Sequence, residues 1–335
     1  MVQKVVKSMT STAPPFATTP ANQYAAALVA PSRNIDRARR LSVWSAYQLG
    51  LLAKTGGDRN LVGWIARHLH QPSKLAWLLS PIDFLRYREL GFALEAIAKL
   101  PRPPQRVLDL SSPKLLPLTL AHALPSASVL STDLLAHEVN WSRGKAVALG
   151  LSNLQARQED ARCLSFDSDC FDLVTSISVF EHIAPEADGD APAIAELARV
   201  LAPGGTAVIT VPCSRTYHAD YIKADVYERQ AGSEPLFFQR FYTPQMLHER
   251  FVRSSGLTLK RLDYIEERCF SSDPKQRVAH WINCSTLQNR VFGPMYPMLS
   301  KVFLSEPRPL ARCRKPYVAC LQLVKPLKPL AESLN

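Results

Sequence analysis

The chain has 335 residues, of which 47% are hydrophobic and 21% are charged. This composition is typical of a globular protein, and the length is sufficient to bury a substantial core. No run reaches the roughly 18 apolar residues that a membrane-spanning helix needs, which argues against an integral membrane protein. The net charge of +11 at pH 7 bears on partners and solubility rather than on the fold.

The positive charge is unevenly distributed along the chain. Residues 1–105 carry 14 basic and 5 acidic side chains, and residues 271–335 carry 10 and 3. Residues 106–270 carry 16 basic and 21 acidic side chains, so the middle of the chain is acidic. The basic flanks fit either an ordinary solvated surface or attraction to an anionic membrane surface, a nucleic acid or an acidic partner.

The seven cysteines do not predict a disulfide framework or a metal site, because their number is odd, their spacing is wide and no C-x-x-C occurs. A reducing compartment is the simplest interpretation, and we expect a cytoplasmic protein. Residues 1–35 contain no Asp or Glu and are rich in Ser, Thr, Ala and Pro, which predicts a disordered tail. An acid-free start of this kind also fits an organellar targeting segment.

The predicted elements begin after this tail. Apolar residues at helical spacing predict a helical cap over residues 36–100, and Pro101–Pro104 closes it as a stiff connection. From residue 106 short apolar runs alternate with helical patterns, which predicts a doubly wound α/β sheet that is mostly parallel. The expected strands cover residues 106–110, 127–133, 154–159, 171–178, 206–211, 257–268 and 317–324. The expected helices between them cover residues 114–124, 138–149, 191–201 and 244–254.

Two segments depart from this alternation. Residues 213–242 form a long stretch rich in Tyr and Phe, which fits either a wall of a substrate site or a lid packed on the sheet. Residues 271–312 form an insertion before the last strand, with an apolar helix candidate over 292–304. We therefore predict a core at 101–270, followed by insertion helices, the last strand and a basic tail at 271–335.

Polar residues, mostly carboxylates, end four successive strands. Asp109 ends the first strand, Asp133 the second, Glu159-Asp160 the third and Glu181-His182 the fourth. Ligands bind at the carboxyl ends of strands in open parallel sheets. Four such ends in succession predict a polar ligand laid across this edge.

Two further stretches carry a family resemblance. The run from Phe171 to Ile183, followed by Glu196 to Gly205 and a strand, resembles class I S-adenosylmethionine-dependent methyltransferases. The resemblance covers roughly residues 85–269 and implies a Rossmann-like seven-stranded sheet with S-adenosyl-L-methionine as cofactor. It also implies that the 109–114 loop receives the methionine part. Asp133 would then bind the ribose hydroxyls, and Asp160 would reach the adenine amino group.

The first loop departs from the family pattern. The family usually has a glycine-rich turn there, whereas this chain has Ser111-Ser112-Pro113-Lys114. Ser112 before Pro113 is a suitable N-cap, which would direct a helix N-terminus at the methionine carboxylate, and Lys114 could add positive charge. Either the loop binds the cofactor in a modified way, or the fold no longer binds it.

The end of the fourth strand is where the methyl group should point. The candidate base is His182, whose imidazole could take a proton from an acceptor hydroxyl, although it could equally orient the loop. Glu181 is grouped with the cofactor-binding candidates. Tyr217 and His218 follow the fifth strand as the nearest candidates to a substrate, with no assigned role.

These observations favour a methyltransferase acting on a small-molecule or lipid-like acceptor. The alternative from another class is a non-catalytic relative of the same fold, suggested by the Ser-Ser-Pro loop. A nucleic-acid methyltransferase is disfavoured because Val179 to His182 occupies the place of the usual base-methylation motif. Peripheral contact of the basic flanks with an anionic membrane stays open, and the sequence does not address oligomeric state.

Overall fold

The structure is a computed structural model that describes part of the chain. The described residues are 85–227, 229–230, 232–268 and 296–327. The predicted N-terminal tail, most of the helical cap and the first half of the predicted insertion lie outside these ranges. The division into domains therefore stays a prediction.

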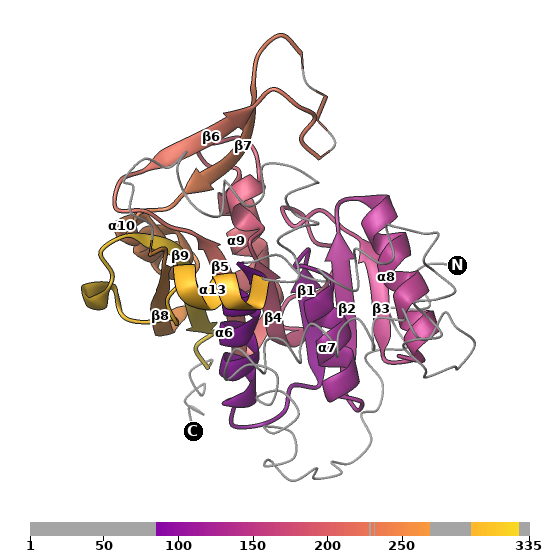
Figure 1. The fold of residues 1–335 in the computed structure, drawn as a ribbon. Coiled ribbons are helices and arrows are strands. Elements are labelled where there is room, and N and C mark those ends of the chain that lie inside the picture. The colour runs from indigo at the N-terminus through magenta and orange to yellow at the C-terminus, as the bar shows by residue number, and fades with distance from the viewer. Residues whose placement is uncertain (1–84, 228, 231, 269–295, 328–335) are drawn as a thin grey trace, which may run out of the picture.

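A seven-stranded sheet forms the centre of the molecule (Figure 1), in the order β3-β2-β1-β4-β5-β9-β8. The first five strands in this order pair in parallel, and β9 is antiparallel to both of its neighbours. The strands are β1 (Arg106–Leu110), β2 (Ser128–Asp133), β3 (Leu154–Gln158), β4 (Phe171–Ile177), β5 (Leu201–Pro212), β8 (Thr258–Glu266) and β9 (Pro316–Val324). This arrangement confirms the predicted doubly wound, Rossmann-like, mostly parallel sheet.

Helices cover both faces of the sheet, because each strand sends successive apolar side chains to opposite sides. In β1, Val107 joins the core beneath α6, α7 and α13, whereas Leu108 joins the core beneath α9. The helices are α6 (Arg86–Ala98), α7 (Leu115–Ala123), α8 (Ala136–Leu149), α9 (Asp190–Val200), α10 (Pro244–Leu247) and α13 (Tyr296–Phe303). Shorter turns are η3 (Phe180–His182), the π-helical η4 (His248–Arg253) and η7 (Leu310–Arg312).

The segment Pro203-Gly204-Gly205 lies between the helix predicted over 191–201 and the strand predicted over 206–211. Helix α9 ends at Val200 and β5 begins at the next residue, so these residues lie inside the strand as an irregularity in its pairing with β4. Gly204 has a φ of 77°, a left-handed conformation that glycine adopts without steric cost. The strand is therefore longer at its start than its apolar run predicted.

The predicted helix over 244–254 is also divided. Thr243 caps its N-terminus, and the Thr243 side chain accepts a hydrogen bond from the Met246 amide at 3.2 Å. Only the first turn is α-helical, however, and the remainder winds as the π-helical segment η4. Phe251 of that segment packs edge-on against Phe180 and Tyr242, which holds it on the sheet.

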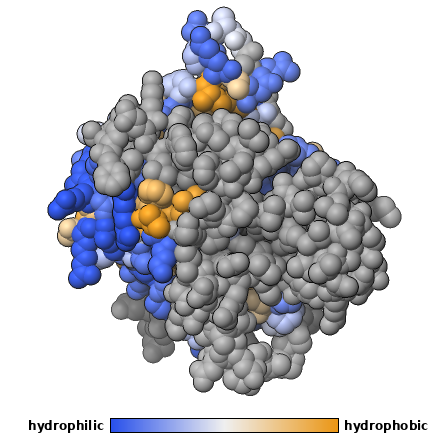
Figure 2. All heavy atoms as spheres, in the orientation of Figure 1, coloured by the Kyte–Doolittle hydropathy of each residue, from blue (hydrophilic) through white to orange (hydrophobic). Residues whose placement is uncertain are grey.

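A β-hairpin formed by β6 (His218–Ile222) and β7 (Leu236–Phe241) projects beyond the end of the sheet (Figure 1). It occupies most of the aromatic stretch 213–242, for which no strands were predicted. In the same orientation, Figure 2 shows strongly hydrophilic and hydrophobic residues side by side on this projection. The hairpin is thus partly exposed, and its aromatic side chains differ in burial: Phe237 and Phe241 are buried, whereas Tyr221 is half exposed.

Candidate functional site

A pocket of about 1100 Å³ opens at the carboxyl ends of β1 to β4. Because parallel strands end at the same edge, the residues that follow them meet there, as the sequence predicted. Its wall includes the 111–114 loop, Asp133, Asp160 and His182. Residues from outside these strand ends complete the wall, namely Arg86, Trp141, Tyr227 and Arg229.

The loop after β1 is fastened to its two neighbouring strands. The amide of Ser111 donates a hydrogen bond to the Thr132 carbonyl oxygen at 3.0 Å. The hydroxyl of Ser112 accepts one from the Ile177 amide, also at 3.0 Å. Ser112 therefore does not cap the following helix, and that prediction is wrong. The position before α7 is Lys114, which makes no capping hydrogen bond through its side chain.

Asp133 lies at the pocket wall with both carboxylate oxygens engaged. Oδ1 accepts a hydrogen bond from the Leu135 amide at 3.0 Å, which fixes the turn after β2. Oδ2 forms an ion pair with Lys114. Both side chains are nearly buried, with 12% of Asp133 and 11% of Lys114 exposed. The carboxylate is thus held in one orientation and remains accessible from the pocket.

Asp160 follows β3 and is held by its own loop. Its carboxylate accepts hydrogen bonds from the guanidinium of Arg162, the shortest at 2.6 Å. These bonds hold the pKa of Asp160 below its ordinary value, so the group is ionised at neutral pH. It is more exposed than Asp133, and its ion pair with Arg162 lies at the rim of the pocket.

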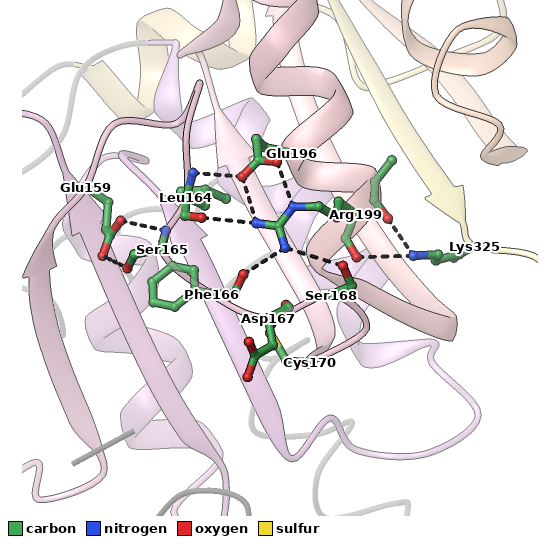
Figure 3. A network of polar contacts seen from close by, with 11 residues as sticks. Glu159, Leu164, Ser165, Phe166, Asp167, Ser168, Cys170, Glu196, Arg199 and Lys325 are labelled. Carbon is green, nitrogen blue, oxygen red and sulfur yellow. Dashed lines mark hydrogen bonds and ion pairs between the residues drawn. The ribbon is translucent and has the colours of Figure 1, made fainter. Parts of the chain in front are cut away.

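A polar network holds the loop that carries Asp160 (Figure 3). Glu159 accepts hydrogen bonds from the hydroxyl of Ser165 at 2.6 Å and from its amide at 3.1 Å. Arg199 of α9 pairs with Glu196 and donates to backbone carbonyl oxygens of the loop, and Glu196 accepts from the Leu164 amide. These contacts join the loop after β3 to α9, so the position of Asp160 is set by residues across the sheet edge.

Asp109 lies beneath the pocket rather than in its wall. Its side chain is fully buried, and Oδ1 accepts a hydrogen bond from the Thr175 hydroxyl at 2.7 Å. Burial raises the pKa of this carboxyl to about 6. The Asp109 side chain, on β1, therefore lies beneath the 111–114 loop and is bonded to β4. It is not among the residues that line the pocket.

Glu181 and His182 have different surroundings although they are neighbours. Glu181 is 1% exposed and outside the pocket wall, and burial raises its pKa to about 8. His182 lines the pocket, with Nδ1 2.8 Å from the Phe238 carbonyl oxygen. Because a carbonyl oxygen can only accept, Nδ1 carries the proton and Nε2 is left as an acceptor. Burial lowers the pKa of His182 to about 4, so its imidazole is neutral at pH 7 and weakly basic.

Three residues in the pocket wall have a left-handed backbone, which costs energy for any residue but glycine. Ser111 follows β1 with a φ of 52°, Ser178 follows β4 with 53°, and Tyr227 in the hairpin connection has 54°. All three line the same pocket. Strain of this kind gathers at functional sites, so it marks the pocket independently of the carboxylates.

Comparisons with known proteins agree with this geometry. Residues 111–209 match the sequence family described as the methyltransferase domain. The match covers 99 of the 335 residues, so it identifies a methyltransferase domain within the chain.

A curated relative, the demethylmenaquinone methyltransferase of Thermus thermophilus, is 35% identical over 125 residues. Those residues are 37% of this chain and 52% of the relative, so the match spans about half the relative's length.

Solved structures resemble the chain only distantly. A coclaurine N-methyltransferase bound to N-methylheliamine and SAH has 11% identity and a TM-score of 0.47, covering 91% of this chain and 98% of that one. A SAM-dependent methyltransferase from Methanosarcina mazei has 14% identity and a TM-score of 0.43, covering 67% and 93%. Similarity this low says nothing about the acceptor.

The pocket wall also contains residues that the sequence did not indicate. Arg86 comes from α6, and Tyr227 and Arg229 come from the connection between β6 and β7. The aromatic richness of 213–242 did suggest a wall there, but the predicted Tyr217 and His218 are not lining residues. Tyr217 donates to Glu186 at 2.6 Å, and His218 stacks on Phe241.

Among the described residues, no helix is both long and apolar enough to cross a membrane. The same residues contain no group of three His, Cys, Asp or Glu side chains placed to hold a metal ion.

Proposed function

We propose that this chain is an S-adenosylmethionine-dependent methyltransferase that acts on a small, lipid-like acceptor. The observation that carries the proposal is the single pocket wall shared by the 111–114 loop, Asp133, Asp160 and His182. When bound, S-adenosylmethionine supplies a methyl group on a sulfonium. The chain's own residues have to hold the two reactants together and exclude water, which is the main contribution to an in-line transfer.

The residues present fit this cofactor. Asp133 offers carboxylate oxygens at the pocket wall, and a carboxylate can accept both hydrogen bonds of a ribose diol. Leu134 and Trp141 line the same pocket and offer apolar and aromatic surface that suits a flat aromatic base. Ser111 has the backbone conformation that a glycine turn would supply, so the loop can approach a ligand closely without glycine. The volume is large enough for the cofactor and a small acceptor together.

In this proposal His182 has an orienting role in the pocket wall and does not remove a proton from the acceptor. Its Nδ1 bond to Phe238 fixes the ring, and its low pKa makes it a weak proton acceptor at neutral pH. The acceptor class follows from the relative acting on demethylmenaquinone and from the apolar part of the wall near His182, which includes Val179 and Ile183. Contact of the basic flanks with an anionic membrane remains a prediction.

The test is calorimetric titration of the full chain with S-adenosylhomocysteine, followed by transfer of labelled methyl groups to fractionated cell extract. We expect binding, stabilisation of about 2.7 kcal/mol at a ligand concentration of 100 times Kd, and label in the lipid-soluble fraction. Absence of binding at millimolar S-adenosylhomocysteine would refute the proposed methyltransferase activity. Label only in nucleic acid or in water-soluble products would refute the acceptor class.

A second candidate is a binding protein of the same fold without methyl transfer. The ion pair between Lys114 and Asp133 favours it, because the carboxylate already has a cationic partner. This candidate predicts that the wild-type chain does not bind S-adenosylhomocysteine. It also predicts that Lys114→Gln, which releases Asp133, does not restore methyl transfer.

A further inference from the structure

The charged groups of the pocket differ between its two ends. At the ends of β2 and β3 the wall contains acidic residues, and Asp133 and Asp160 are each paired with a cation of the same wall, Lys114 and Arg162. At the end of β4 the charged residues of the wall are two arginines, Arg86 and Arg229. The acceptor must enter at this second end, because the cofactor occupies the first in the proposed function.

Arg86 is held in place by a buried carboxylate. It forms an ion pair with Glu89 of the same helix, and Glu89 is fully buried. Glu89 also accepts hydrogen bonds from the hydroxyls of Ser178 and Thr210, both at 2.7 Å. The charge of Arg86 is thus balanced by Glu89, and its position at the pocket wall beside Ser178 is fixed.

Arg229 differs from Arg86 in having no anionic partner within the described part of the chain. Its Nη2 donates to the Phe237 carbonyl oxygen at 2.8 Å, which anchors the guanidinium to β7. None of the ion pairs among the described residues includes Arg229. A half-buried guanidinium in a pocket wall retains several donors that a planar anionic group would match.

The other ionisable groups at this end do not neutralise Arg229. Glu181 lies within η3 and is buried, and its raised pKa of about 8 keeps it mostly protonated at neutral pH. His182 is uncharged at the same pH. The ring of His182 lies 5.4 Å from that of Tyr227 and 4.8 Å from that of Phe238, so aromatic surfaces border the positive charge.

We propose that the acceptor is an aromatic anion, a ring carrying a carboxylate or phenolate oxygen, and that Arg229 binds this oxygen. The proposal rests on the methyltransferase function above. It assigns the aromatic surfaces of Tyr227 and His182 to the ring, and the guanidinium of Arg229 to the charge. An acceptor that binds already ionised also needs no strong base, which agrees with the neutral, weakly basic His182.

The experiment measures binding of 1-naphthoate and 1-naphthamide to the full chain saturated with S-adenosylhomocysteine. The two probes have similar shapes and differ in charge. We expect at least tenfold tighter binding of the naphthoate, because a charge-assisted hydrogen bond contributes at least that factor. Arg229→Gln should reduce the preference to less than threefold, Arg229→Lys should retain part of it, and Kd for S-adenosylhomocysteine should change by less than twofold in both.

Lys223→Gln is the matched control, since Lys223 is an exposed cation just beyond β6 and outside the pocket wall. It should leave the preference intact. Equal binding of the two probes to the wild type would overturn the proposal, as would a preference that survives Arg229→Gln. A loss of S-adenosylhomocysteine binding in Arg229→Gln would also overturn it, by assigning Arg229 to the cofactor. Failure of the wild type to bind S-adenosylhomocysteine would instead refute the methyltransferase function itself.

Discussion

The two ends of the pocket are built in different ways. At the ends of β1 to β3, short loops present Asp133 and Asp160 directly, and each carboxylate is paired with a cation close to it in the fold. At the end of β4, the wall comes from α6, η3 and the hairpin connection, and it depends on groups buried beneath it. The first end follows from the topology of a parallel sheet, whereas the second depends on how additional elements pack.

The burial of the supporting charges shows the same contrast. We call the ends of β1 to β3 the cofactor end and the end of β4 the acceptor end, after the roles proposed above. The ion pairs of the cofactor end, Lys114–Asp133 and Arg162–Asp160, keep some contact with water. Beneath the acceptor end, Asp190 and Arg240 are both fully buried and their charged atoms lie 2.6 Å apart. Arg240 also donates to the Ile183 and Pro185 carbonyl oxygens, which fastens β7 to the loop after η3. We therefore expect substitutions of the buried charges beneath the acceptor end to affect folding, and substitutions of the carboxylates at the cofactor end to affect binding.

Asp190→Asn should have the largest effect on stability. Its carboxylate pairs with Arg240 and Arg250 and accepts a hydrogen bond from Tyr242 at 2.7 Å. Removing the charge leaves the buried Arg240 without its counterion, which should lower the free energy of unfolding by about 3–5 kcal/mol. The free energy of unfolding can be measured by urea denaturation followed by circular dichroism.

The control is Asp172→Asn, because Asp172 pairs with Arg106 at an exposed site. Loss of such a pair should cost less than about 1 kcal/mol. Equal effects of the two substitutions would contradict the contrast between buried and exposed supports.

Asp133→Asn should mainly weaken cofactor binding. A carboxylate accepting from a diol contributes about 1.5–3 kcal/mol per hydrogen bond, so Kd for S-adenosylhomocysteine should rise about 100-fold. Calorimetric titration measures this Kd. Asp167→Asn is the control, because Asp167 is exposed on the loop after β3 and lies outside the pocket wall. A change of less than threefold in Asp133→Asn would remove Asp133 from the binding site.

Strands such as β1 and β4 could be predicted because each contains a short apolar run bounded by polar residues. The predicted boundaries of β1 and β3 agree with the structure to within one residue. The hairpin could not be predicted in this way. Its strands pair residues as far apart as His218 and Phe241, and most β6 side chains are half-exposed without alternation. Tertiary pairing, rather than local pattern, forms it.

The site divides along the same line. Asp133 and Asp160 were predicted because parallel strands bring their ends together whatever the loops do. Arg86 and Arg229 were not, because nothing in their local sequence distinguishes them from other surface arginines. Arg86 reaches the pocket through the burial of Glu89, and Arg229 through the hairpin. Ser112 was predicted as a helix cap, but its hydroxyl is engaged by the Ile177 amide across the sheet.

The pH dependence of stability should report the buried carboxyl at the acceptor end. Glu181 ionises near 4.5 in the unfolded chain and at about 8 in the folded one. The unfolded state thus binds fewer protons between these values, and stability should fall as the pH rises toward 8, by at most about 1.4 kcal/mol per pH unit. The contribution of His182 to stability depends on pH in the opposite direction, because its folded pKa of about 4 lies below the ordinary 6.5. That contribution is lost as the pH falls from 6.5 toward 4.

The window from pH 6.5 to 8 therefore isolates Glu181. Denaturation curves at several pH values should show that the free energy of unfolding falls with rising pH in the wild type and in His182→Gln. In Glu181→Gln this fall should be much smaller. An unchanged slope in Glu181→Gln would mean that another group titrates in this window.

Ser111→Gly should have the smallest effect on stability of these substitutions. The left-handed φ of Ser111 costs about 1–2 kcal/mol in the folded state, which glycine would remove. Glycine also has more freedom to lose on folding, worth about 0.5–1 kcal/mol, so the net change should stay within about 1 kcal/mol. Ser111→Val should instead destabilise the loop, because a β-branched residue fits this conformation poorly.

The useful readout is binding. If the loop holds the cofactor through its backbone, Ser111→Gly should retain or improve Kd for S-adenosylhomocysteine and Ser111→Val should raise it at least tenfold. Ser178→Gly is the matched control, since Ser178 has the same backbone conformation at the acceptor end. That substitution also removes the hydroxyl bond to Glu89, so it should alter naphthoate binding and leave the cofactor unaffected. If Ser178→Gly weakened S-adenosylhomocysteine binding and Ser111→Val weakened only naphthoate binding, the cofactor would bind at the end of β4 and the acceptor at the ends of β1 to β3.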